Sequence, residues 1–288
     1  MKLNPGVVNV YKEPGYTSHD VVAIMRKIFG TKKVGHTGTL DPNAEGVLPI
    51  CIERATKLAE FLTAQDKTYV ADLILGITTD TGDTSGEVLT RCTPGADVDD
   101  VIEGVIASFC GEYLQTPPMY SAIKIGGKKL YQLARQGITV ERKPRPVIIH
   151  RINLIEAIPG GYRLQVSCGK GTYIRSLCED IGRALGCGAT MGRLVRTRSG
   201  QFDIRDAIKL VDMKERNIEE LIMPIDQILP YPACHVQSGA ISQAINGNPL
   251  ELTLIDGDVT DKCWLWGEGR LIGLYRKDAN ILRPEVML

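Results

Sequence analysis

The feature that most constrains the fold is a long alternating segment in the middle of the chain. Apolar and polar residues alternate over residues 147–158 and again over residues 162–168, with Pro159, Gly160 and Gly161 between the two runs. A period of two indicates strands with one buried face, and the Pro-Gly-Gly break predicts a hairpin. A chain built around such a pair needs an antiparallel sheet, which excludes an all-helical fold.

Segments with helical periodicity lie on both sides of this hairpin. Strands are expected over residues 7–11 and 67–76. The spacing of apolar residues predicts helices over residues 18–30, 55–64, 97–109 and 172–185. Strands and helices mixed in this way, with a hairpin at the centre, predict an α+β fold in which helices flank a central, mainly antiparallel sheet.

The composition changes at two places along the 288 residues. Residues 116–146 hold four prolines, a Gly-Gly pair and many cations, which predicts an irregular insertion. A second change falls at residues 229–232, and short strand-like pieces follow it. We therefore expect a main domain over residues 1–230, with the insertion at about 116–146, and a small β domain over residues 231–288.

The net charge is zero, because 34 Lys and Arg balance 34 Asp and Glu. A neutral total argues against a nucleic-acid binder, but the charges are segregated. Residues 117–151 contain eight cations and one acid, residues 163–198 contain seven cations and two acids, and residues 66–112 contain ten acids and two cations. Basic segments with Tyr120, Tyr131 and Tyr173 among them suit RNA, although a solvated surface with local ion pairs explains the charges equally well.

Cysteine and histidine do not indicate a metal site. The eight cysteines include no C-x-x-C pair, and the four histidines are scattered. The sequence therefore predicts buried, reduced thiols, no metal and no cofactor. The first residues lack the apolar core of a signal peptide, and no apolar run reaches the ~18 residues that span a bilayer. We expect a cytoplasmic protein with no membrane association.

An unusual motif lies between the first helix and an apolar strand. Residues 35–49 read GHTGTLDPNAEGVLP and combine three glycines and two prolines with His36 and Asp41. Glycines let a ligand approach the backbone closely, and Pro42 restricts Asp41 to an extended backbone. From the residues alone, Asp41 and Pro42 can equally form a turn or the start of a helix.

This motif, extended to "GHTGTLDPNAEGVLPICIERATKL", resembles the signature of the TruB family of tRNA pseudouridine synthases. Other segments are similar to later parts of that family, although Glu13 follows Lys12 where the family has Pro, and Val195 stands where an Arg is often found. The resembling segments are residues 8–22, 67–88, 117–137, 167–189, 194–202 and 269–288. The resemblance implies a pseudouridine-synthase fold, a thumb-like insertion and a C-terminal PUA-like RNA-binding domain.

The resemblance also assigns roles to residues. It implies that Asp41 is the essential catalytic carboxylate, Arg175 its cationic partner, and Tyr69 the aromatic ring that stacks on a flipped base. Asp83 is expected to hold the loop near Arg175. The substrate-binding residues that it implies are His36, Tyr173, Lys12, Lys128 and Lys129.

The implied reaction isomerises the T-loop uridine at position 55 of tRNA. The bond from C1′ to N1 breaks, the base rotates, and C5 re-attaches to C1′ without any added atom, so no cofactor is required. The family implies a monomer that binds the tRNA T-arm and needs no protein partner. Two alternatives remain, which are a non-catalytic tRNA-binding or folding chaperone and a guide-RNA-dependent enzyme.

Overall fold

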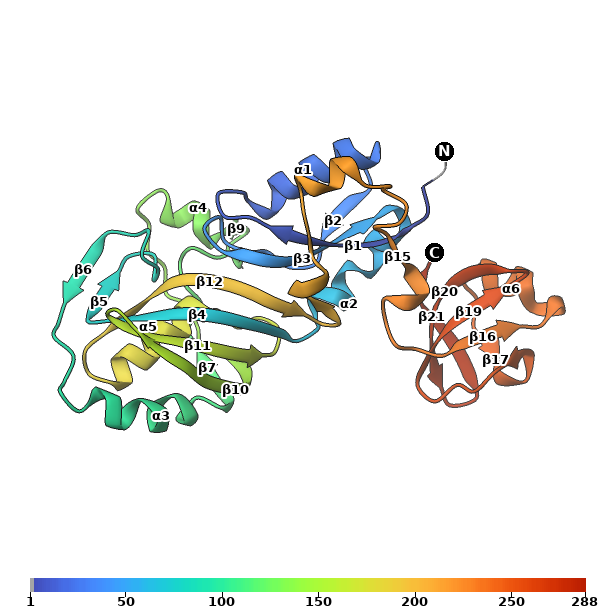
Figure 1. Ribbon diagram of the computed structural model, residues 1–288. Coiled ribbons are helices and arrows are strands. Elements are labelled where there is room, and N and C mark those ends of the chain that lie inside the picture. Colours follow the sequence, from blue (N-terminus) through green and yellow to red (C-terminus); the bar gives the residue numbers. More distant parts are fainter. Residues whose placement is uncertain (1–2) are drawn as a thin grey trace.

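The computed structural model describes residues 3–288, without the side chains of residues 214 and 215. The chain first builds a large sheet and then a smaller one (Figure 1). The order of the main strands in the eleven-stranded sheet is β14-β1-β3-β12-β4-β11-β10-β7. The strands of this sheet are β1 (Gly6–Lys12), β2 (Val34–His36), β3 (Glu45–Ile52), β4 (Lys67–Leu75), β7 (Gly111–Gln115), β10 (Arg145–Ile158), β11 (Gly161–Cys168), β12 (Ala189–Ser199), β13 (Phe202–Asp203), β14 (Ile208–Lys209) and β15 (Met223–Pro224).

Antiparallel pairing dominates the large sheet. Two pairings, β1 with β14 and β3 with β12, are parallel, and the others are antiparallel. The hairpin of β10 and β11 turns at Pro159 and Gly160, where Gly160 has a φ of 79°. A side chain is strained in that conformation, so glycine is suited to the turn. The predicted hairpin and the α+β class with a mainly antiparallel sheet are both confirmed.

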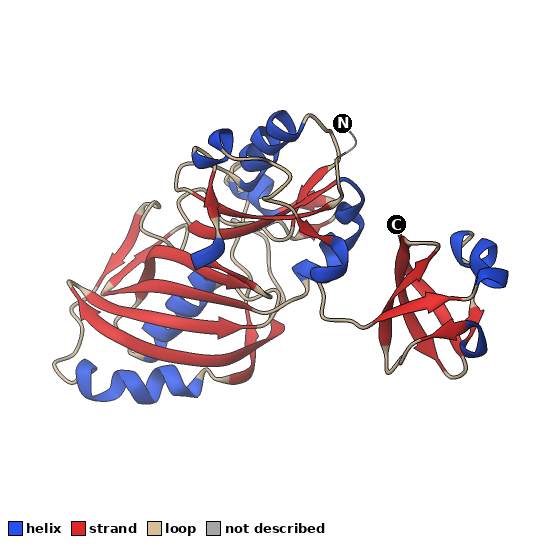
Figure 2. Cartoon of the chain, turned by 45° about the vertical axis from the view of Figure 1, so that its right-hand side comes forward, coloured by secondary structure: helices blue, strands red, loops and turns tan. Residues whose placement is uncertain are grey.

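The longer helices share one apolar core with the large sheet (Figure 2), and the short helical segment at residues 53–63 packs with Val7, Val47 and Cys51 on the other face. In β4, every second residue from Tyr69 to Leu75 is buried and packs in the same core as α5 (Ile174–Ala184) and α3 (Val98–Ser108). The helix α1 (Ser18–Phe29) begins at Thr17, whose side chain forms a capping box with Asp20, and ends at the left-handed Gly30. The sequence predicts these helices because each has one continuous apolar face.

One predicted helix differs from the structure. Instead of a single helix over residues 55–64, the chain forms a 3-10 helix at Glu53–Leu58 and then α2 (Ala59–Thr63). Ala55 and Leu58 are both buried in one apolar cluster. Residues three apart share a face in a 3-10 helix, so packing of this pair favours the tighter turn.

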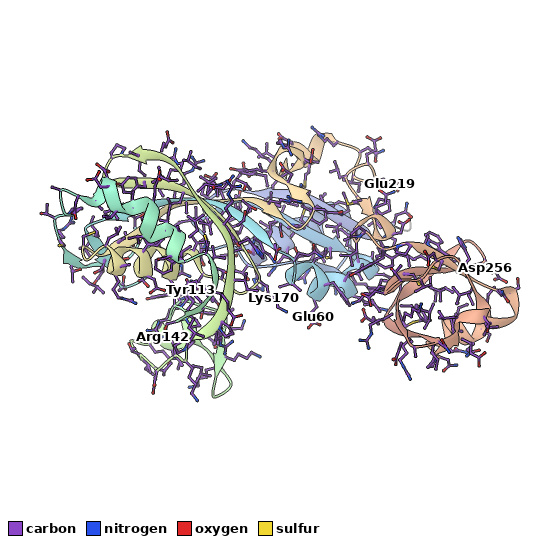
Figure 3. The ribbon with its side chains drawn as sticks, turned by 90° about the horizontal axis from the view of Figure 1, so that it is seen from below. Glu60, Tyr113, Arg142, Lys170, Glu219 and Asp256 are labelled. Atoms are coloured by element: carbon purple, nitrogen blue, oxygen red, sulfur yellow. The ribbon has the colours of Figure 1, made fainter. Side chains whose placement is uncertain are left out.

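The segment of residues 116–146 contains more regular structure than the sequence predicts. A short hairpin of β8 (Lys124–Ile125) and β9 (Lys128–Lys129) leads into α4 (Leu130–Ala134). Figure 3 shows that this lobe, marked by Arg142, extends away from the sheet. A second two-stranded sheet, of β5 (Ile77–Thr79) and β6 (Val88–Arg91), lies earlier in the chain.

The C-terminal part forms a six-stranded sheet with α6 (Ile241–Ile245). Its strands, in order, are β17 (Leu250–Glu251), β21 (Ile281–Met287), β20 (Arg270–Asp278), β19 (Lys262–Gly267), β16 (Ala233–Val236) and β18 (Ile255–Asp256). The strand β21 escapes sequence analysis because Arg283 and Pro284 interrupt its apolar pattern. No helix within residues 3–288 is both long and apolar enough to cross a membrane.

An apolar cluster joins this small sheet to the large one. Trp264, Leu274 and Val286 from the C-terminal strands pack in one buried cluster with Val47 and Cys51 of β3. The Trp264 indole also donates to the Leu229 carbonyl, and the Lys57 ammonium donates to the Met287 carbonyl. The two sheets therefore share a core across their boundary.

Candidate functional site

Asp41 lies on the loop between β2 and β3, at the middle of the large sheet. The loop is closed by a turn in which the Ala44 N–H donates to the Asp41 carbonyl. On its other side, Leu40 exchanges hydrogen bonds with the Ser18 hydroxyl at the start of α1. The Asp41 side chain is 37% exposed, so the fixed loop presents a carboxylate that a substrate can reach.

Arg175 forms a two-point ion pair with Asp41. Its Nε lies 3.0 Å from one carboxylate oxygen and its Nη2 lies 3.3 Å from the other. The same guanidinium donates to the carbonyls of Thr81 and Tyr120, and its side chain is 5% exposed. A planar donor fork that is fixed at four acceptors holds the carboxylate in one orientation.

Lys12 supports the Asp41 loop from beneath. Its ammonium donates to the carbonyls of Glu13, Pro42 and Ala44 at 2.5–3.2 Å, and the residue is 0% exposed. Burial lowers the pKa of Lys12 to about 8, against the opposing attraction of Asp41. The resemblance implies that Lys12 binds the substrate; in the structure its ammonium is enclosed beneath the loop and bonded to backbone carbonyls.

A second enclosed cation, Arg196, holds the opposite end of the loop. Its guanidinium donates to the Val47, Gly38 and Thr39 carbonyls at 2.7, 3.2 and 3.5 Å, and it is 1% exposed. The sequence pattern does not single out Arg196. Leu194, Val195 and Arg196 are all buried, so β12 has no period-two alternation there that would mark this arginine as pointing inward.

Tyr69 lies directly opposite Arg196 in the pairing of β4 with β12. Side chains opposed in this way lie close together on one face of a sheet. Burial raises the pKa of the Tyr69 phenol, and the nearby Arg196 guanidinium opposes the shift. The structure therefore brings Tyr69, Arg196 and the Asp41 loop to one place on the sheet.

His36 and Tyr173 border this region. The His36 ring accepts a hydrogen bond from the Gly38 N–H and meets the edge of the His19 ring at 5.4 Å between centroids. Burial lowers the pKa of His36, which favours the neutral imidazole. Tyr173 lies directly before α5, two residues before Arg175, and burial raises the pKa of its phenol.

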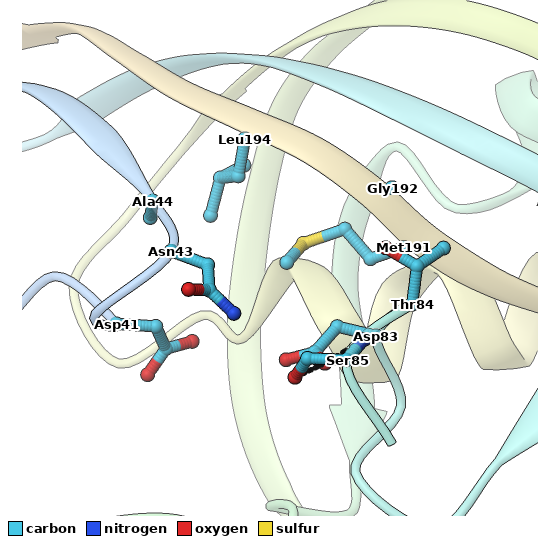
Figure 4. A pocket seen from close by; sticks show the side chains of 9 residues that line it. All are labelled: Asp41, Asn43, Ala44, Asp83, Thr84, Ser85, Met191, Gly192 and Leu194. Carbon is cyan, nitrogen blue, oxygen red and sulfur yellow. Dashed lines mark hydrogen bonds between the residues drawn. The ribbon is translucent and has the colours of Figure 1, made fainter. Parts of the chain in front are cut away.

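A small cavity lies beside the Asp41 carboxylate. Figure 4 shows Asp41 and Asn43 on one side of it, and Asp83 and Ser85 on the other. Its volume of about 30 Å³ is enough to hold a water molecule. The Asp83 carboxylate accepts from Thr81 and Ser85, so it orders the turn whose Thr81 carbonyl binds Arg175.

Lys128 and Lys129 lie on the β8–β9 hairpin rather than beside Asp41. Lys128 is exposed, and the Lys129 ammonium lies 5.6 Å from the centroid of the Tyr131 ring, which Arg135 also approaches at 5.6 Å. The cations of residues 117–151 form no ion pair with any carboxylate that the structure describes. The hairpin is therefore a separate, positively charged surface.

The other basic segment, residues 163–198, is different. Arg163 pairs with Asp72 and Glu156, and Arg175 pairs with Asp41. Further pairs join Arg183 to Asp180 and Arg193 to Glu45. The sequence leaves open whether this segment is an RNA surface or a surface with local ion pairs, and these contacts favour the second interpretation. In the described part of the chain, no group of three or more His, Cys, Asp or Glu is placed to hold a metal ion.

Solved structures with similar folds provide the first comparison. The crystal structure of a Cbf5–Nop10–Gar1 complex contains a chain that is 29% identical, with a TM-score of 0.72 over 98% of this chain and 84% of that one. An H/ACA RNP bound to a substrate RNA containing 2′-deoxyuridine gives a TM-score of 0.71 at 26% identity, with the same coverage of 98% and 84%.

Family models and curated relatives define the class more closely. The N-terminal domain model of the TruB family pseudouridylate synthases matches residues 26–174, and the tRNA pseudouridylate synthase B C-terminal domain matches residues 175–230. The chain belongs to the TruB family of pseudouridylate synthases, as its motifs predict. Two relatives named tRNA pseudouridine synthase B illustrate the similarity. The protein of Alkaliphilus oremlandii is 50% identical over 85% of this chain and 82% of its own, and that of Clostridium novyi is 42% identical over 98% and 99%.

Proposed function

We propose that the protein converts the T-loop uridine at position 55 of tRNA to pseudouridine, with Asp41 as the essential carboxylate. The observation that carries the proposal is the two-point ion pair of Asp41 with Arg175, on a loop that two further buried cations hold beside Tyr69. This arrangement occurs in a chain of the TruB family, whose members named above are tRNA pseudouridine synthases, so the enzyme is an isomerase.

The reaction needs a nucleophile or base and few other groups. The C1′–N1 bond breaks and a C1′–C5 bond forms, while the C5 proton leaves and N1 gains a proton. An ionised carboxylate in a fixed position can act on the sugar carbon or on a sugar proton. Because Arg175 keeps Asp41 in one orientation, the carboxylate loses little conformational entropy on reaching the transition state, and this lowers the barrier.

The aromatic residues provide contacts for a base that has left its stack. We propose that Tyr69 stacks on the flipped uracil and that Tyr173 contacts the substrate. A neutral His36 would stack in the gap that the departed base leaves in the T-loop. Bases removed from a helix are commonly held against aromatic rings in this way.

The charge distribution suggests where the T-arm binds. The insertion of residues 116–146 carries cations without carboxylate partners in the described chain, including Lys128 and Lys129, and these are suited to RNA phosphates. In the proposed C-terminal PUA-like domain, residues 231–288, three cations are paired internally. Glu285 contacts Lys262 and Arg276, and Asp278 contacts Arg283. We therefore propose that the insertion contributes most of the electrostatic attraction for tRNA.

Release of tritium tests this function directly. Unmodified tRNA that carries tritium at C5 of uridine should release it when incubated with the protein, and the product should contain pseudouridine at position 55. The Asp41→Asn and Asp41→Ala variants should bind the tRNA but release no tritium. Retained activity in either variant would contradict the role of Asp41.

A chaperone that binds tRNA without modifying it is the alternative function. Binding of tRNA by the wild-type protein without tritium release would favour that alternative, but the complete set of Asp41, Arg175 and Tyr69 speaks against it as the sole role. We further propose that the protein is a cytoplasmic monomer that acts without a guide RNA or a protein partner. Turnover of free tRNA by the purified chain at a single-protomer mass is the corresponding test.

A further inference from the structure

Gln115 connects two parts of the site that are far apart in the sequence. It is the last residue of β7, directly before the insertion of residues 116–146, and it is 1% exposed. Its Oε1 accepts from the Tyr173 N–H at 2.8 Å, while its Nε2 donates to the Tyr173 carbonyl at 3.0 Å and to the Tyr113 hydroxyl. One buried amide thus binds both backbone groups of Tyr173, the residue directly before α5.

Neighbouring contacts extend this connection. The Ser176 hydroxyl donates to the Thr116 carbonyl at 2.9 Å, and the Arg175 Nη2 donates to the Tyr120 carbonyl at 2.8 Å. Residues 115, 116 and 120 therefore all bond to residues 173–176, the first turn of α5. The start of the insertion and the start of α5 form one hydrogen-bonded unit.

Arg175 belongs to this unit and also to the Asp41 pair. Its guanidinium plane is set by Asp41 on one side, and by the Thr81 and Tyr120 carbonyls on the others. The donors of a guanidinium lie in a fixed plane, so a shift of one acceptor tilts the bonds to all of them. If the start of the insertion moves relative to α5, the ion pair with Asp41 changes too.

We propose that Gln115 is a positioning residue for the reaction, which acts through Arg175 and does not touch the substrate. By fixing the start of the insertion to α5, it makes the RNA-binding lobe a part of the catalytic apparatus. The stem of the lobe sets the geometry of Arg175 and Asp41, whereas the cationic tip at Lys128 and Lys129 only attracts RNA. This inference rests on the proposed function, because it needs a turnover rate to act upon.

Two matched variants separate these roles. Gln115→Met has a side chain of similar length without polar atoms, and the paired Lys128→Glu and Lys129→Glu change alters the tip alone. Single-turnover rates at saturating tRNA, tRNA dissociation constants and melting temperatures are measured for both. A displacement of about 1 Å can cost on the order of 100-fold in rate. We expect Gln115→Met to lower the rate roughly 30-fold or more with less than about threefold change in affinity.

The tip variant should show the opposite pattern, with affinity reduced about tenfold or more and a saturated rate within about twofold of wild type. A double-mutant cycle with Arg175→Lys adds a readout that a structural role would not produce. If Gln115 acts through Arg175, the Gln115→Met change should cost less than about threefold in the Arg175→Lys background. If the double variant instead loses rate by the product of the two single-variant losses, the proposal is overturned.

A fold-retaining second variant keeps the test decisive. Gln115→Glu preserves the acceptor for the Tyr173 N–H but places an acceptor opposite the Tyr173 carbonyl, so it should also lower the saturated rate. If Gln115→Met does not fold, the same criteria apply to Gln115→Glu. The inference is overturned if a folded variant, at saturating tRNA, reacts within twofold of the wild-type rate. It is also overturned if the loss of rate disappears when the variant is measured well below its melting temperature, because the loss then reflects unfolding. A wild-type protein that releases no tritium would contradict the proposed function instead.

Discussion

Two regions of the molecule have similar numbers of cations and use them in opposite ways. Residues 117–151 contain eight Lys and Arg, and residues 163–198 contain seven. In the second region, Arg163, Arg175, Arg183 and Arg193 contact carboxylates, and Arg196 is enclosed by backbone carbonyls. In the first region, no cation pairs with a carboxylate that the structure describes, and the β8–β9 hairpin extends into solvent.

The difference shows that charge density along a sequence does not reveal which cations are paired within the fold. Two of these partners, Asp72 of Arg163 and Glu45 of Arg193, lie more than ninety positions away along the chain. Only the fold brings them together. The first region should therefore govern affinity and its dependence on salt, and the second should govern stability and the rate of chemistry.

The largest effect is expected in the second region, from Arg175→Lys. The lysine ammonium keeps the charge but cannot contact both Asp41 oxygens and two carbonyls at once. We expect the single-turnover rate to fall by about 100- to 1000-fold, with little change in tRNA affinity or in its salt dependence. Quench-flow measurement of tritium release at saturating tRNA checks this. A loss of tRNA affinity with a normal rate would show that the second region governs binding and not chemistry.

In the first region, Lys128→Glu with Lys129→Glu should act on binding. Each phosphate contact contributes roughly 0.7–0.9 to the slope of log affinity against log salt, so losing two contacts should flatten the slope by about 1.5. Affinity at low salt should fall by about tenfold. Filter binding from about 50 to 300 mM salt tests this, and an unchanged slope would place the RNA elsewhere.

The pH dependence of the rate tests whether the charged Lys12 ammonium is needed to hold the Asp41 loop. The pKa of Lys12 is lowered from 10.5 to about 8, so its ammonium loses a proton above that pH and has fewer N–H groups for three carbonyls. If only the charged form holds the loop, the rate should fall about tenfold from pH 7 to pH 9.

The stability of the protein should not follow this loss of rate. Between about pH 8 and 10.5, the unfolded chain binds the Lys12 proton more tightly than the folded protein, so this group makes the protein more stable as pH rises. Rate profiles and melting temperatures measured together would distinguish loosening of the loop from unfolding. A Lys12→Arg variant that folds should keep its rate to higher pH.

The smallest effect is expected from Arg163→Gln in the second region. This change removes contacts with Asp72 and Glu156 on the outer side of the sheet, and surface ion pairs contribute little. The melting temperature should change by about 2 °C or less, and tRNA affinity and rate should stay within about twofold. A marked loss of affinity would show that RNA also contacts the second region.

The sequence predicts much of the fold and the central pair of the site, but not what supports them. The alternation of residues 147–168 predicts the hairpin because one face is buried, and the TruB-like motifs point to Asp41 and Arg175. The contacts of Lys12, Gln115 and Arg196 could not be predicted, since they are made to carbonyl groups supplied by distant segments. Every residue has a backbone carbonyl, so the sequence does not show which carbonyls a polar side chain will contact. A residue that makes such contacts therefore looks like any other polar residue in the sequence.

The apolar cluster between the two sheets affects how the protein unfolds. Val47 and Cys51 of β3 are buried together with Trp264, Leu274 and Val286, and β3 begins at the end of the Asp41 loop. Removing the C-terminal strands would expose this face of β3 to water and weaken the strand that anchors the loop. The two parts should therefore unfold in one cooperative transition. The C-terminal part then stabilises β3, and through it the Asp41 loop, and does not fold independently of the large sheet.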